Sequence, residues 1–363
     1  MSASTHFSET YIEARDKFRA ALAASGGRLR ESVLHPLKGP GGEDLHTDVA
    51  WVGPDRPDSL LVLVTGVHGV EAYCGGGCVT GWLARDHFAR QAGPRTAVMI
   101  VHGINPWGFA HKRRVNENNV DLNRNFVPHD RPYPENRPYA DLAAHVDPAD
   151  WTPDALAAHD RAIVDYHGGA GAVRMGKAVH GGQYVNPRGT FYGGAGAEWS
   201  NTAFRRILRD HARGPSDVAL IDYHSGGGHW GYFELFIDDS FAGRPTRSWF
   251  DNVVSIADDK AMYGEDAQSN TPGNLIYSLP EELPDARTTI CLTELRCGAE
   301  SSIATIRAEN WLMHHGDPES PQGLAIRREL FDCFNPAAPE WRAMQLAQSN
   351  ACIGEALAGL AAG

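Results

Sequence analysis

The sequence predicts an α/β fold in which a mixed, mostly parallel central sheet carries helices on both faces. Short, continuous apolar runs, typical of strands buried on both faces, alternate along the chain with amphipathic helical patterns. Polar side chains follow several of these runs, and strand ends are where such folds place their functional residues. No linker-like break or internal repeat interrupts the chain, so we expect one domain over residues 1–363.

The N-terminal part of the chain is predicted to pass from a helix to a buried strand and back to a helix. Thr10 and Glu13 form a capping box that opens a helix extending to about Ala24. Polar, glycine- and proline-rich residues then lead to an apolar strand at 60–67. Residues 72–90 are predicted to be helical despite three consecutive glycines, which indicates a helix start pressed against another backbone.

The remaining elements continue the alternation, with two irregular stretches between them. Residues 105–138 are polar and irregular, a composition typical of functional loops. Residues 168–196 are rich in glycine, which indicates either a loop folded tightly near a site or an exposed excursion. We expect strands at 97–102, 217–223, 233–237 and 288–295, helices at 154–166, 199–213 and 241–262, and C-terminal helices from about 303, 321 and 341 that end near 360.

Composition and charge narrow the class of protein. The chain has 363 residues, of which 42% are hydrophobic and 21% charged, as in soluble globular proteins with a substantial core. Its net charge of -12 would repel nucleic acid and anionic lipid surfaces, so we expect neither as a partner. The N-terminus lacks the order of a secretory signal, and the apolar run at 60–67 is too short to span a membrane. We therefore expect a cytoplasmic protein, and its oligomeric state stays open.

The six cysteines are interpreted as reduced, small apolar residues rather than as a disulfide framework. The alternative is a thiolate metal site, formed by Cys74 with Cys78 or by Cys291 with Cys297. No Cys-x-x-Cys pair is present, which argues against that alternative.

Two histidines and a glutamate form a candidate zinc site. His68 and Glu71 lie on the loop that follows the strand at 60–67, and His224 closes the apolar run at 217–223. Zinc in hydrolases usually takes three nitrogen or oxygen ligands and keeps a fourth position for water. His68 and Glu71 share one turn, which would orient both of them. His224 comes from a distant part of the sequence, so the site would be complete only after the chain has folded. In the alternative interpretation the pair is an ordinary strand-end turn and His224 is a core histidine.

Two carboxylates are candidates for supporting roles at such a site. Asp121 is the expected second partner of a ligating imidazole, because the ring usually donates its other N–H to a carboxylate. Glu294 closes the strand predicted at 288–295, where it would act as a general base towards water and then return the proton to a leaving amine.

Arginines and an asparagine in the polar stretch complete the candidate site. A developing oxyanion needs a fixed positive donor, for which Arg113 and Arg114 are both candidates. Arg124 with the neighbouring amide of Asn123 suits a substrate carboxylate. The alternative is that these arginines form a solvated basic patch.

At these residues the chain resembles the zinc carboxypeptidase superfamily, which also includes the aspartoacylase and succinylglutamate desuccinylase deacylases, and within it a little-characterised intracellular branch. The resemblance implies one zinc ion per chain, held by His68, Glu71 and His224, with Glu294 as the base. It also implies that Arg113 or Arg114 stabilises the oxyanion, and that Asn123 and Arg124 bind the terminal carboxylate of the substrate. The motifs lie within residues 60–296: His68-Gly69-Val70-Glu71, Asn105-Pro106-Trp107-Gly108, Asp121-Leu122-Asn123-Arg124-Asn125-Phe126, His224-Ser225 and Thr293-Glu294.

The resemblance leaves the substrate open. The tyrosine that caps the substrate in the family has no clear counterpart here, and Tyr263 and Tyr277 are the two candidates. A carboxypeptidase-like zinc peptidase acting next to a free carboxylate is the first hypothesis. A small-molecule N-acyl amino acid deacylase, or a zinc-binding module without catalysis, are the alternatives. A hydrolase with a nucleophilic side chain is disfavoured because the chain has no Gly-x-Ser-x-Gly elbow.

Overall fold

A mixed sheet forms the centre of the molecule. The computed structural model describes residues 2–85, 88–167, 181–251, 254–255, 273–298 and 302–362. Within these residues the sheet is 8-stranded, in the order β1-β2-β4-β3-β5-β8-β6-β7. The central strands β4, β3, β5 and β8 run parallel, whereas β2 and β6 pair antiparallel with their neighbours β4 and β8. The predicted fold class, a mixed sheet with helices on both faces, is confirmed.

The bounds of the elements are as follows. The strands are β1 (Arg28–Lys38), β2 (Asp44–Val52), β3 (Ser59–Thr65), β4 (Thr96–His102), β5 (Asp217–Gly226), β6 (Phe233–Asp238), β7 (Val254–Ser255) and β8 (Arg287–Arg296). The α-helices are α1 (Tyr11–Ala24), α2 (Ala72–Ala84), α3 (Phe88–Gln91), α4 (Pro106–Ala110), α5 (Arg137–Val146), α6 (Pro153–His167), α8 (Trp199–His211), α10 (Ser278–Glu282), α11 (Ser302–His314), α12 (Pro321–Phe334) and α13 (Pro339–Ala362). Short 3-10 helices are η1 (Ala3–His6), η2 (Gly69–Glu71), η3 (Leu122–Arg124), η4 (Arg247–Trp249) and η6 (Leu275–Tyr277).

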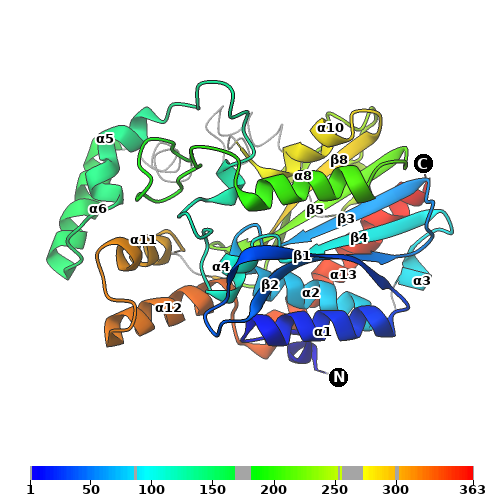
Figure 1. Ribbon diagram of the computed structural model, residues 1–363, viewed down its shortest axis with the longest axis horizontal. Coiled ribbons are helices and arrows are strands. Elements are labelled where there is room, and N and C mark those ends of the chain that lie inside the picture. Colours follow the sequence, from blue (N-terminus) through cyan, green and yellow to red (C-terminus); the bar gives the residue numbers. More distant parts are fainter. Residues whose placement is uncertain are drawn as a thin grey trace.

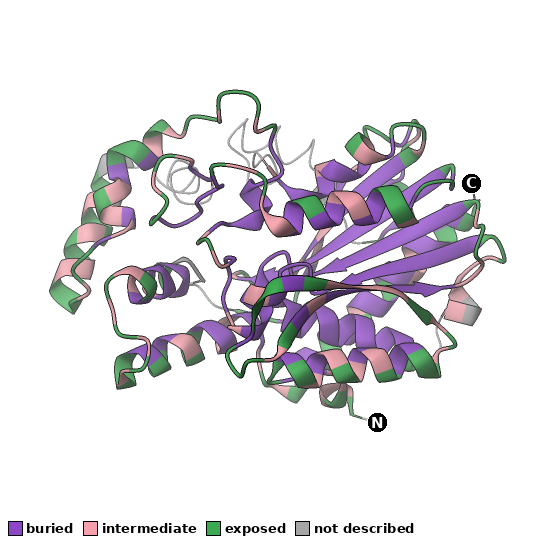
Figure 2. Cartoon of the chain, viewed as in Figure 1, coloured by how far each residue is buried: buried purple, intermediate pink, exposed green. Residues whose placement is uncertain are grey.

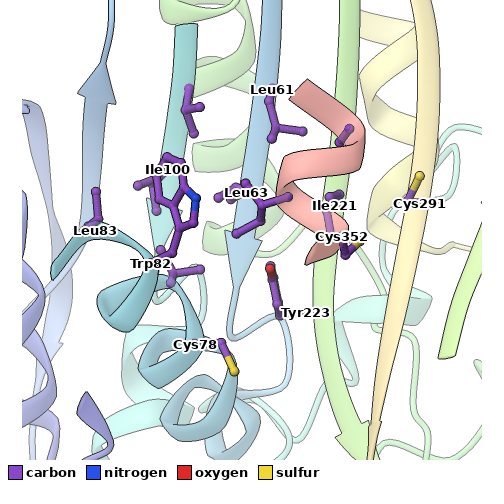
Figure 3. Close-up of a cluster of buried hydrophobic side chains, with 14 of the residues drawn as sticks. Leu61, Leu63, Cys78, Trp82, Leu83, Ile100, Ile221, Tyr223, Cys291 and Cys352 are labelled. Carbon is purple, nitrogen blue, oxygen red and sulfur yellow. The ribbon is translucent and has the colours of Figure 1, made fainter. Parts of the chain in front are cut away.

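Helices cover the sheet from both sides. In Figure 1, α1, α2 and α13 lie against one face, whereas α8 and α10 lie against the other. The strands β3, β4 and β5 are buried along their whole length, as Figure 2 shows in purple. On the first face, side chains such as Leu63 of β3 and Ile221 of β5 pack against Trp82 of α2 and Cys352 of α13 (Figure 3). This two-sided burial explains why these strands read as continuous apolar runs.

The N-terminal prediction was correct for the helix and missed two strands. Thr10 caps α1 by accepting a hydrogen bond from the backbone N–H of Glu13, as the capping box predicted. The polar stretch before residue 59 nevertheless forms β1 and β2. Asp48 is fully buried in β2 because Arg15 and Ser32 donate hydrogen bonds to its carboxylate. These partners, distant in sequence, let a strand carry a charged residue in its interior.

Two other stretches differ from prediction. The polar stretch of 105–138 contains α4, and its end is already part of α5. The helix predicted at 241–262 is wrong for the residues described there, which form the short η4 and β7. Pro245 lacks a backbone N–H, and the carboxylate of Asp239 accepts hydrogen bonds from the next two backbone N–H groups, so a turn forms instead of a helix.

The C-terminal helices are confirmed as α11, α12 and α13. Together with α5 and α6, the helices α11 and α12 lie at one end of the molecule (Figure 1). In α12, the backbone carbonyl of Phe334 accepts a hydrogen bond from the hydroxyl of Ser225, so this helix reaches the end of β5. Among the described helices, none combines the length and the apolar character needed to cross a membrane.

Candidate metal centre and active site

The ends of three parallel strands bring the candidate ligands and the candidate base together. Thr65, the last residue of β3, is in register with Tyr223 of β5, so the loop carrying His68 begins beside His224. His224 is in turn in register with Glu294 of β8. Gly69 permits the loop to pass close to α4, because a Cβ on this glycine would lie 2.1 Å from the backbone of Gly108.

Three side chains point their ligand atoms at one position. His68 Nδ1 lies 2.9 Å from Glu71 Oε1, and His224 Nδ1 lies 3.1 Å from Glu71 Oε2. The two Nδ1 atoms are 3.3 Å apart. All three residues are buried. Among the described residues they are the one group of three or more histidine, cysteine or acidic side chains whose ligand atoms lie within 4.8 Å of one another.

The chemistry of this donor set fits zinc. Asp121 lies 3.0 Å from His68 Nε2 and Asp222 lies 2.8 Å from His224 Nε2, so each ring donates its Nε2–H to a carboxylate. When both rings are neutral, the two Nδ1 atoms present lone pairs to each other, beside the carboxylate of Glu71. Ligands bound tetrahedrally at 2.0–2.2 Å would lie about 3.3 Å apart, close to the separations found here.

The electrostatics around the site also favour a positive charge there. Burial alone would raise the pKa of Glu71, but His68 and His224 outweigh it and hold that pKa below its ordinary value. Burial disfavours the charged form of His224, yet Asp222 and Glu71 raise its pKa well above the ordinary range. Either a proton or a metal cation bound among these groups would supply the positive charge that they favour.

Asp121 connects the ligands to the arginines. Its Oδ1 faces His68 and accepts from the backbone N–H of Asn123, while its Oδ2 accepts from Arg114 Nη1 at 2.6 Å. Burial opposes its ionisation, but Arg114, Arg124 and His68 hold the pKa of Asp121 well below its usual range. This one carboxylate therefore orients a ligand and fixes the neighbouring guanidinium.

The two adjacent arginines point in different directions. Arg114 lies against Asp121, stands over the ring of Phe191 and lines the central cavity. Arg113 instead forms a buried ion pair with Glu309 of α11 and is not among the residues that line the cavity. Of the two candidates, the structure places Arg114 at the site and Arg113 away from it.

Asn123 and Arg124 also line the cavity. The side-chain oxygen of Asn123 accepts a hydrogen bond from the backbone N–H of Leu275 at 2.8 Å, which fixes its amide. Arg124 is buried, its Nη1 lies 4.0 Å from Asp121 Oδ2, and its guanidinium stands 5.8 Å from the centre of the Phe191 ring. The loop and η3 therefore present an amide and a guanidinium side by side.

Glu294 faces the cavity from β8. Its side chain is 24% exposed, and Arg296 Nη1 lies 3.7 Å from its Oε2. Burial raises the pKa of Glu294, and this effect outweighs the opposing charge of Arg296. A carboxylate with a raised pKa, open to a cavity beside a candidate metal site, is suited to accept and release a proton.

Of the two tyrosine candidates for capping the substrate, only Tyr277 lies among the described residues. Tyr277 does not line the cavity; its hydroxyl pairs with Asp238, and burial raises the pKa of Tyr277 to about 12. That assignment is therefore corrected. Tyr263 lies outside the described residues.

Several residues at the site were not predicted, among them Asp222, Arg296, Phe191 and Glu234. Asp222 supports His224 and Arg296 lies beside Glu294; each is two positions away on the same strand, and alternation along a strand puts such pairs on one face. That spacing was a usable signal. Phe191 and Glu234 also line the cavity. Phe191 belongs to the glycine-rich stretch of 168–196, for which a loop near a site was one of two interpretations, whereas nothing in the local sequence connects Glu234 to the cavity.

The cavity has an apolar side and a charged side. It has a volume of about 370 Å³. Phe236, Ile276 and Leu292 line it and pack on the core cluster between the sheet and α8. Glu234, Glu294 and Arg296 line it as well. A ligand therefore meets apolar and ionic surfaces within one cavity.

Comparison with known proteins finds solved structures that align with this chain and one family model that matches it. The bovine thrombin-activatable fibrinolysis inhibitor aligns at 13% identity over 96% of this chain and 98% of its own, with a TM-score of 0.48. Carboxypeptidase A of Helicoverpa armigera aligns at 12% identity over 89% of this chain and 73% of its own, with a TM-score of 0.45. A metallo-carboxypeptidase of Burkholderia cenocepacia aligns at 14% identity over 86% of this chain and 68% of its own, with a TM-score of 0.38.

No curated protein matches the chain in sequence. The family model described as "Protein of unknown function (DUF2817)" matches residues 7–348, which is most of the sequence and includes every residue assigned to the candidate site. The chain therefore belongs to the DUF2817 family.

Proposed function

We propose that the chain is a zinc-dependent hydrolase that cleaves a peptide or related amide bond next to a free carboxylate. The observation that carries the proposal is the convergence of two imidazole Nδ1 atoms and the Glu71 carboxylate beside a cavity that also contains Glu294. A zinc-binding module without catalysis has no need of a cavity-facing carboxylate next to its metal ligands. For this reason the catalytic interpretation is preferred.

His68, Glu71 and His224 would hold the metal, with Asp121 and Asp222 fixing the orientation of the two rings. When bound there, zinc supplies a Lewis acid that acidifies water and polarises a carbonyl oxygen. Glu294 removes a proton from the attacking water and delivers it to the leaving nitrogen. Its raised pKa brings both halves of this transfer closer to neutral pH.

The cationic residues bind and orient the substrate. Arg114, fixed by Asp121, donates to the carbonyl oxygen as negative charge develops on it. Arg124 and the amide of Asn123 hold the free carboxylate on the leaving side of the bond. The apolar side chains of Ile276, Leu292 and Phe236 favour an apolar side chain on that leaving residue.

The test combines metal analysis with substrate screening of the purified protein. We expect one zinc per chain, hydrolysis of short peptides with a free carboxyl terminus, loss of activity with a chelator and recovery on adding zinc. A His224→Ala variant serves as the control and should retain neither zinc nor activity. N-acyl amino acids form the second arm, and faster cleavage of these would favour the deacylase alternative. A metal-free protein, or activity insensitive to chelation, would refute the proposal.

A further inference from the structure

The cavity contains a second carboxylate, Glu234, that the proposed mechanism leaves unused. Glu294 of β8 is in register with His224 of β5 on one side and with Glu234 of β6 on the other. These three side chains therefore form one row across three neighbouring strands. The side chain of Glu234 is 33% exposed and lines the cavity, so it is accessible to a ligand bound beside Glu294.

Contacts with Arg296 set the direction of the Glu234 carboxylate. Arg296 Nε donates to Glu234 Oε2 at 3.0 Å, Nη2 donates to the same oxygen, and Nη1 donates to the backbone carbonyl of Gly227 at 2.9 Å. Arg296 lies two residues beyond Glu294 along β8, whereas Leu292 lies two residues before it, opposite Phe236. The Glu234 carboxylate is therefore turned towards the Arg296 side of the row and away from Leu292.

The two sides of Glu294 correspond to the two parts of the substrate. The side-chain oxygen of Asn123 accepts a hydrogen bond from the backbone N–H of Leu275. The next residue, Ile276, packs on the same core cluster as Leu292 and Phe236. A substrate carboxylate held by Asn123 thus places the leaving residue on this apolar side. The acyl part of the substrate then extends to the other side of Glu294, where Glu234 and Arg296 lie.

The formal charges of the two sides differ in sign. On the acyl side the carboxylates of Glu234 and Glu294 share one guanidinium, Arg296, so the formal charges of these three groups sum to one negative charge. On the other side, Arg114 and Arg124 both face Asp121, and the formal charges of these three groups sum to one positive charge. A cavity with this distribution is complementary to a dipolar ligand, with its carboxylate at the arginines and its cation near Glu234.

Distance also favours a cation close to the scissile bond. Neighbouring strands lie about 4.8 Å apart, so Glu234 is one strand away from Glu294. In an aminoacyl group the nitrogen is two bonds from the carbonyl carbon, so a carbonyl beside Glu294 brings its α-ammonium within reach of Glu234. We infer that the substrate is a short peptide whose residue before the scissile bond has a free ammonium group, and that Glu234 is the specificity-determining residue that accepts it.

This inference rests on the proposed function and makes it more specific, because N-acyl amino acids and N-blocked peptides have no such cation. The experiment compares alanyl-leucine with N-acetyl-alanyl-leucine, which contain the same scissile bond, using zinc-loaded protein at pH 7. At this pH most of the α-amino groups of the dipeptide are protonated. We expect kcat/KM to be about 10- to 100-fold higher for the free dipeptide, the usual value of a hydrogen bond between charged groups.

Glu234→Gln should reduce this preference to near unity while retaining cleavage of the acetylated peptide. Glu281→Gln is the matched control, because its side chain on α10 is 51% exposed and is not part of the cavity lining. The control should keep the wild-type preference. Melting temperatures of all variants check that they are folded.

The outcomes separate the inference from the function on which it rests. Equal rates for the two peptides, faster cleavage of the acetylated peptide, or an unchanged preference in folded Glu234→Gln would overturn the inference and leave the hydrolase proposal intact. The first two comparisons need only the wild-type protein, so they decide the matter even if the variant does not fold. No cleavage of either peptide by zinc-loaded protein would refute the proposed function, and the inference with it.

Discussion

The cavity has two charged walls that are constructed in different ways. The cationic wall, formed by Arg114, Arg124 and their shared partner Asp121, comes from the irregular segment after β4. The anionic wall, formed by Glu294, Glu234 and Arg296, comes from the adjacent strands β8 and β6. In the anionic wall, strand register places the groups directly. In the cationic wall, no register exists, and a buried carboxylate orients the arginines instead.

The walls also differ in exposure. The side chains of Arg114 and Arg124 are 6% and 7% exposed, whereas those of Glu294 and Glu234 are 24% and 33% exposed. The cations are thus held in fixed positions, as binding and charge stabilisation require. The carboxylates are open to the cavity, as proton transfer and contact with a substrate cation require. Mutations that affect one wall should therefore differ in kind from mutations that affect the other.

The largest effect is expected in the anionic wall at Glu294. Glu294→Gln keeps the size of the side chain but removes its ability to take a proton, so turnover should fall roughly 10²- to 10⁴-fold. Zinc content should stay at the wild-type level, because the ligands are untouched. Turnover measurements together with elemental analysis check both statements, and a fully active variant would exclude Glu294 from the mechanism.

The next largest effect should distinguish Arg114 from Arg113. Arg114→Met removes the donor that is fixed by Asp121 and directed at the cavity, so kcat should fall about 10²- to 10³-fold. Steady-state kinetics on a good peptide substrate provide the measurement. A variant with normal kcat would show that this guanidinium does not contact the reacting carbonyl.

Arg113→Met is the matched control for that prediction. It leaves Glu309 buried without its partner, so the free energy of unfolding should decrease by about 3–5 kcal/mol. The kcat of the folded fraction should stay near the wild-type value. Denaturant unfolding and active-site titration together test this contrast, which would disappear if both variants lost kcat equally.

The smallest effect is expected for Arg124→Ala, and it should depend on the substrate. Loss of this guanidinium should raise KM about 10- to 100-fold for peptides with a free carboxyl terminus, the usual range for a charge-assisted hydrogen bond. Peptides with an amidated carboxyl terminus should be cleaved at the wild-type rate, however slow. Equal losses on both kinds of peptide would indicate that Arg124 supports the fold of the loop rather than the substrate.

The sequence predicted best what depends on short-range pattern. The buried strands β3 and β5 were recognisable because burial on both faces gives each a continuous apolar run. The capping box at Thr10 located the start of α1 to the residue. By contrast, β2 was missed because its polar residue Asp48 is tolerated only through contacts with Arg15 and Ser32, which lie elsewhere in the chain.

By itself, the sequence determined the fold class and the candidate groups His68, Glu71, His224 and Glu294, because strand-end chemistry leaves a local signature. Only the tertiary structure decided which neighbour faces the cavity. It directed Arg114 towards Asp121 and Arg113 towards Glu309, it removed Tyr277 from the site, and it brought Glu234 beside Glu294. The physical reason is that the direction of a buried charge is set by its counter-charge and by strand register, and both come from residues far away in the sequence.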